Sequence, residues 1–126
     1  MAYSNLSTVE VEELLHSYYE VDAPEHVLEN VHLELVFRQC QESAKKFRAM
    51  IEGMSFNDLH RDEDRLRSQL EADYQEVTTD LREFSVTPEE ATIECKSLVE
   101  QMDLLRQTVE DKLDEDVENW RLRGAF

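Results

Sequence analysis

Apolar residues recur along the chain at alternating intervals of three and four, which is the spacing of one face of an α-helix. Polar residues and the rare prolines and glycines divide this pattern into four stretches. The pattern predicts an all-α protein, an elongated antiparallel bundle of three long helices with a short N-terminal helix and coiled-coil-like packing. The helices are expected over residues 8–21, 24–54, 57–84 and 88–123, within a single domain spanning 1–126.

The strictest repeat lies in the first long helix, at Leu33, Phe37, Cys40, Ala44, Phe47, Ile51 and Met54. A heptad repeat packs against a neighbouring helix, which can belong to the same chain or to another. A second apolar face over residues 28–35 indicates a second neighbour, for which the short helix is a candidate. The next helix carries its seam as far as Phe84 and is expected to pack loosely at its start, because its seam position there is Glu63.

Capping signals mark the helix starts. Ser7, Ser55 and Thr87 stand where a side-chain oxygen can accept a hydrogen bond from a free backbone N–H group of the first turn. For the second helix, one of residues 22–23 is expected to be the cap, with Pro24 inside the first turn.

The last helix is expected to be longer than its neighbours. After Val109 its apolar stripe slips in phase and runs on through Leu113, Val117 and Trp120, past the point where the preceding helix can cover it. A tryptophan in such a position is a candidate anchor for a partner protein. The candidate partner-binding residues are Phe37, Phe47 and Ile51, if their seam is intermolecular, together with Val117, Trp120 and Leu122 at the tail.

Charge narrows the range of partners. The chain has 30 acidic and 13 basic residues and a net charge of −17, spread evenly between the apolar stripes. Such a surface repels phosphate groups, so direct nucleic-acid binding is not expected. No apolar run approaches the ~18 residues of a membrane span, so membrane insertion is not expected either. Residues 1–5 lack the basic and apolar regions of a secretory signal.

Candidate chemistry is sparse. Glu13 with His16 and Glu29 with His32 have the Glu-x-x-His spacing of carboxylate-bridged metal sites in helical bundles. In a chain so rich in acids, this spacing is also typical of solvated helix faces. No glycine-rich phosphate loop or nucleophile elbow is present. We therefore expect a protein that is not an enzyme, with no catalytic residues, cofactor or metal.

Two stretches resemble the family of ESCRT-I subunits with the modifier-of-rudimentary domain. One is Leu6–Ser7 followed by Val11–Leu15, and the other is the Leu-x-x-x-Leu-x-x-x-Tyr pattern within Leu66–Val77. The resemblance implies an elongated endosomal-sorting subunit that assembles with other helical chains.

The predicted function is that of a non-catalytic assembly or adaptor subunit in the cytoplasm or nucleus. It would pair, as a hetero- or homo-oligomer, with protein partners that offer a helical or basic surface. The alternatives are the ESCRT-I-like sorting subunit, a self-contained spacer of the size of a spectrin repeat, and a carboxylate-bridged metal-binding bundle.

Overall fold

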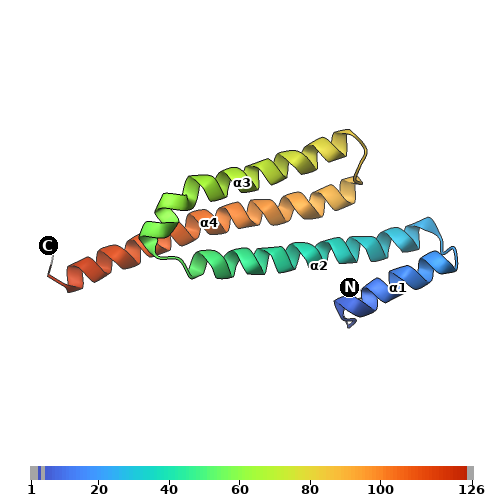
Figure 1. Cartoon of the computed structure of the whole chain (residues 1–126), viewed down its shortest axis with the longest axis horizontal. Coiled ribbons are helices and arrows are strands. Elements are labelled where there is room, and N and C mark those ends of the chain that lie inside the picture. The colour runs from blue at the N-terminus through green and yellow to red at the C-terminus, as the bar shows by residue number, and fades with distance from the viewer. Residues whose placement is uncertain (1–2, 4, 125–126) are drawn as a thin grey trace.

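The computed structural model describes residue 3 and residues 5–124, and within them the chain forms four α-helices and no strand (Figure 1). The helices are α1 (Thr8–Glu20), α2 (Glu25–Glu52), α3 (Phe56–Arg82) and α4 (Pro88–Leu122). The predicted all-α class is confirmed. The stretch 1–5, which bears on a secretory signal, falls largely outside the described residues. None of the described helices is long and apolar enough to cross a membrane.

The helix starts follow the capping signals. Ser7 Oγ accepts a hydrogen bond from the Glu10 backbone N–H at 3.1 Å, and the Glu10 carboxylate accepts one from the Ser7 N–H, which completes a capping box. Ser55 and Thr87 accept equivalent bonds from the backbone of the third helical residue, both at 3.2 Å. These bonds satisfy N–H groups that a helix start leaves without an intrahelical partner.

The expected cap of α2 was wrong. Pro24 itself is the N-cap residue, and no side chain caps this helix. Asp22 instead closes α1, with a positive φ of 51°. The N–H of Ala23 reaches back to the carbonyl of Tyr18 and that of Asp22 to Tyr19, which is the hydrogen-bond pattern of a Schellman motif. Aspartate tolerates this left-handed conformation better than most residues.

The end of α3 differs from the prediction in a similar way. The helix ends at Arg82, and Phe84 has a φ of 60°, with the Ser85 N–H bonded to the Asp80 carbonyl. Phe84 therefore occupies the left-handed position of a second Schellman motif, which glycine usually fills. Its side chain is 93% exposed, so its assignment to the apolar seam was wrong.

Replacing Phe84 with glycine is expected to stabilise the protein by about 0.5–1 kcal/mol, because glycine adopts a positive φ without the steric cost that a Cβ carries. The exposed side chain contributes little packing that could be lost. Urea unfolding measures the change. The matched control is Phe84→Ala, which keeps a Cβ at the same φ and should bring no gain. Equal stability of the two variants would show that the conformation carries no strain.

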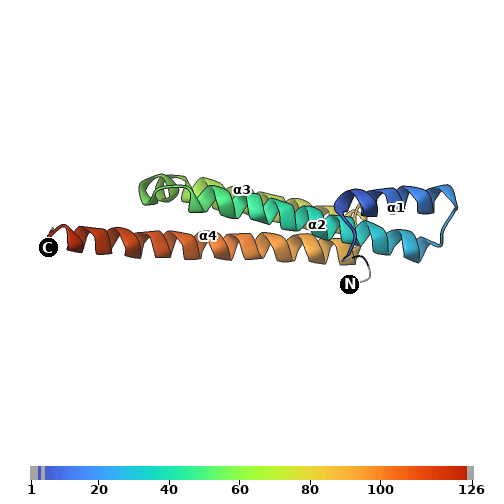
Figure 2. The ribbon, with the colours of Figure 1, turned by 90° about the horizontal axis from the view of Figure 1, so that it is seen from below.

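The helix α4 makes the main contacts with the other two long helices. It packs along α3 on one side and along α2 on the other, and α1 packs on α2. Figure 1 shows this order across the molecule, with α2 and α4 running in the same direction and α3 antiparallel to both. Figure 2, turned by 90°, shows that α4 lies to one side of α2 and α3 and extends beyond their shared end.

The larger of two buried clusters lies where α2 turns into α3. Ile51, Leu59, Leu66 and Leu105 form one buried cluster there, so three helices meet at this point. The expected loose packing at the start of α3 was therefore wrong. Glu63 does not enter the cluster, since it is only partly buried and pairs with Arg67 on its own helix.

A second buried cluster joins the short helix to α2. Val11 packs with Val31 and Leu35, with Leu14 and Leu15 at its edge. This confirms α1 as the neighbour of the second apolar face of α2. A helix of 13 residues is marginal in isolation, so this contact is what keeps α1 folded.

Candidate interaction surfaces

The predicted partner residues on α2 have three different environments. Ile51 is fully buried in the cluster of Leu59, Leu66 and Leu105. The chain itself thus covers this part of the seam, which corrects the choice of Ile51 as a contact residue. Phe47 is half-buried against the same cluster. Phe37 is also half-buried, but it lines a groove that is open to solvent.

The predicted tail residues lie on the part of α4 that extends beyond the other helices. Lys112 of α4 is tied to the body, because its Nζ donates a hydrogen bond to the Glu52 carbonyl at 3.0 Å. Every residue from 113 to 124 is exposed. We call the ten residues 113–122 the α4 overhang. At 1.5 Å per residue it is about 15 Å long, and both views show it clear of α2 and α3 (Figures 1 and 2).

The overhang carries an apolar stripe that is rotated from the buried face of α4. Leu113, Val117 and Trp120 are 43%, 41% and 52% exposed and are spaced by four and three residues. At about 100° per residue they lie about 60–120° around the helix from Leu105, so the apolar phase slips after Val109. Leu122 is still more exposed but is rotated away from this stripe, two residues past Trp120. The overhang thus presents an exposed apolar stripe on a segment that projects beyond α2 and α3.

A groove between α2 and α4 was missed by the sequence analysis. It consists of two adjoining cavities of about 540 and 280 Å³, floored by Phe37, Ala44, Ile93 and Leu104. Lys45, Arg48 and Lys96 line it together with a single acid, Glu100. The sequence signals were present, as a basic cluster at 45–48 and an apolar Ile93 outside the α4 seam. What the spacing did not reveal is that α2 and α4 are direct neighbours.

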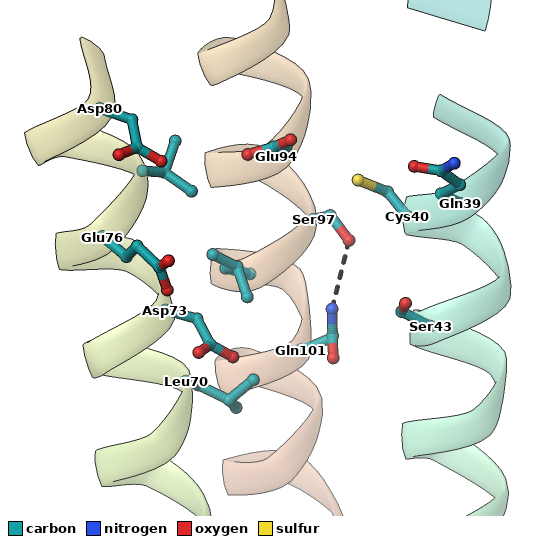
Figure 3. A pocket seen from close by; sticks show the side chains of 12 residues that line it. Gln39, Cys40, Ser43, Leu70, Asp73, Glu76, Asp80, Glu94, Ser97 and Gln101 are labelled. Carbon is teal, nitrogen blue, oxygen red and sulfur yellow. Dashed lines mark hydrogen bonds between the residues drawn. The ribbon is translucent and has the colours of Figure 1, made fainter. Parts of the chain in front are cut away.

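A second groove lies on the other side of the α2–α4 contact, between α2 and α3 and above α4 (Figure 3). Its volume is about 420 Å³. The acidic residues that line it from α3 are Asp73, Glu76 and Asp80, and α4 contributes Glu94. The side facing them is neutral and carries Gln39, Cys40 and Ser43 of α2. The groove is therefore acidic along one wall.

This environment raises the pKa of the Glu94 carboxyl. Burial is the largest cause, followed by the negative charges of Glu90, Asp80 and Glu76, while His32 has a smaller opposing effect. His32 Nε2 also lies 3.4 Å from the Glu90 carboxylate.

Both thiols are kept protonated by their surroundings. Burial and the charge of Glu94 raise the pKa of the Cys40 thiol, which a hydrogen bond with Ser97 lowers only in part. The same two causes raise the pKa of Cys95. The reactive form of cysteine is the thiolate, so these half-buried thiols are suited to packing rather than to nucleophilic chemistry.

Replacing Glu94 with glutamine is expected to raise the melting temperature at pH 7. A carboxyl whose pKa is higher in the folded than in the unfolded state destabilises the folded protein at every pH above its folded-state pKa. The difference in melting temperature between the variant and the wild type should shrink as the pH falls through the raised pKa of Glu94. It should vanish below about 4.3, the pKa of a glutamate in the unfolded chain. Melting curves between pH 4 and pH 7.5 measure this. Glu118→Gln, on the exposed overhang, is the control and should show no such trend, and a gain independent of pH would contradict the assigned cause.

The histidines of the two Glu-x-x-His pairs lie beside other carboxylates instead of converging on one point. His16 pairs with Glu20 at 3.1 Å, and His32 with Glu90. Within residues 3 and 5–124, no three histidine, cysteine or acidic side chains are close enough to hold one metal ion. We therefore propose no metal centre.

Comparisons with models of protein families, with curated proteins and with solved structures found no match to this chain. The resemblance of Leu66–Val77 to ESCRT-I subunits thus stays a prediction.

Proposed function

We propose that this protein is a non-catalytic assembly subunit that pairs with other helical chains through the α4 overhang. The observation that carries the proposal is the exposed apolar stripe of Leu113, Val117 and Trp120, on the part of α4 that extends beyond α2 and α3. Apolar side chains at helical spacing on an isolated helix gain free energy when another helix covers them.

The surroundings of the stripe indicate the kind of partner. The overhang has four acids and one base, and the chain as a whole carries −17. A partner helix with basic residues beside its apolar face would be attracted to it. The bundle would then continue past the α2–α3 turn with coiled-coil-like packing, in the cytoplasm or nucleus.

The exposed stripe favours this function over a self-contained spacer, which would cover its own apolar stripes. No observation singles out an endosomal-sorting complex. The identity of the captured partner tests that narrower proposal.

A photo-crosslinking amino acid at position 120 tests the proposed function in cells that produce the protein. We expect specific adducts between this position and another polypeptide chain. The matched control carries the crosslinker at Glu71, an exposed position on α3 within the body. If position 120 captures nothing that position 71 does not, the overhang is not a docking surface.

A further inference from the structure

The groove between α2 and α4 has features that match those of the overhang. Its floor is apolar, and three of its four charged lining residues are basic, in a chain whose net charge is −17. It extends over residues 37–48 of α2, which at 1.5 Å per residue is about 18 Å. A ligand for this groove would therefore be a short amphipathic helix with acidic flanks.

The chain contains such a helix. The overhang is about 15 Å long, and its apolar stripe has Asp114 and Asp116 on its two sides, since each residue turns the helix by about 100°. Because it projects from the body, its side chains are accessible to another molecule. It cannot reach the groove of its own chain, since it is a rigid continuation of α4, which itself forms one wall of that groove.

We propose that the α2–α4 groove binds the overhang of a second copy of this chain, so that the protein self-associates head to tail. The proposal rests on the function proposed above and names one partner for the overhang. Phe37, Ala44 and Ile93 would receive Leu113, Val117 and Trp120, while Lys45 and Lys96 would face Asp114 and Asp116.

The contact is heterologous, because a groove on one molecule receives a different surface of the next. Pairing of two overhangs with each other would instead bring two acidic segments together. The surface that a helix of ten residues can bury is below the ~1,200 Å² of stable complexes, so the association should be weak and dependent on concentration.

Two variants separate these arrangements. Val117→Asp disables the overhang, and Lys45→Glu with Lys96→Glu disables the groove. All three positions are exposed, so both variants should melt as the wild type does. Trp120→Ser is a second overhang variant should Val117→Asp disturb the helix. A mixture of two chains tests the predicted pairing of charges. One chain carries Lys45→Glu and Lys96→Glu in the groove, and the other carries Asp114→Lys and Asp116→Lys in the overhang.

Sedimentation velocity is the decisive measurement. We expect the wild type to sediment faster as its concentration is raised from about 10 μM to about 1 mM, within the range of weak interfaces. Each variant alone should lose this dependence, with affinity at least about tenfold lower. An equimolar mixture of the two should form dimers and nothing larger, since one supplies an intact overhang and the other an intact groove. The single tryptophan lies in the overhang, so its emission should shift to the blue in the wild type and in the mixture.

Three results would overturn the proposal. The first is a wild type that stays monomeric at about 1 mM. The second is self-association of the groove variant, which would indicate pairing between overhangs. The third is self-association of the Val117→Asp variant, which would place the contact elsewhere. The first result leaves the crosslinking test at position 120 untouched, so the proposed function could still stand with a different chain as partner.

Discussion

Replacing Leu105 with alanine is expected to lower the free energy of unfolding by about 2–5 kcal/mol. Leu105 of α4 is fully buried and packs with Ile51 of α2 and with Leu59 and Leu66 of α3. Removing three carbons from this point takes contacts from three helices at once and leaves a cavity that they cannot close without moving apart.

Urea unfolding followed by circular dichroism measures the loss. Leu105→Met keeps nearly the same volume and should cost less than about 1.5 kcal/mol. Leu113→Ala makes the same chemical change on the overhang, where the leucine is exposed, and should cost about 0.5 kcal/mol or less. If Leu105→Ala and Leu113→Ala unfold at the same urea concentration, the cluster is not the centre of the core.

Local signals in the sequence predicted the helices well. The capping box at Ser7 and the Thr87–Pro88 start depend only on residues within one turn, so their chemistry can be recognised without any knowledge of the fold. The turns that end α1 and α3 were harder to predict. Their left-handed residues are Asp22 and Phe84, and neither is the glycine that usually marks such a turn.

The spacing of apolar residues shows which face of a helix is covered but not which helix covers it. The predicted antiparallel bundle left open which long helix lies between the others, and α4 is the helix that α2 and α3 each pack along. This is why the groove between α2 and α4 was not expected. It is also why Ile51, a good seam position, proved to be an internal contact.

The overhang is the part of the candidate site that the sequence did predict. Its recognition required only that α4 be longer than α3 and carry apolar residues at helical spacing to its end, and both can be seen from residue numbers. The groove could not be found in this way, because its basic residues Lys45, Arg48 and Lys96 come from two helices and meet only in the folded chain.

A second large effect is expected from a buried charge pair that ties the N-terminal segment to α2. The Arg38 side chain, 15% exposed, donates to the Glu34 carboxylate at 2.8 Å, and that carboxylate is 7% exposed. The same guanidinium donates to the Tyr3 carbonyl at 2.8 Å and contacts the Thr8 hydroxyl at 3.4 Å. Glu34→Ala should therefore cost about 2–3 kcal/mol, because it leaves a largely buried cation without its counter-charge.

A double-mutant cycle separates the pair from its surroundings. Glu34→Ala and Arg38→Ala should each destabilise the protein, and the double variant should lose clearly less than the sum of both, since no unpaired charge remains. Arg38→Ala should in addition speed hydrogen exchange in α1, because only this variant releases the Tyr3 carbonyl and the Thr8 hydroxyl. Additive losses would mean that each side chain acts through its own packing. Unchanged exchange in α1 would mean that the Val11 cluster alone holds that helix in place.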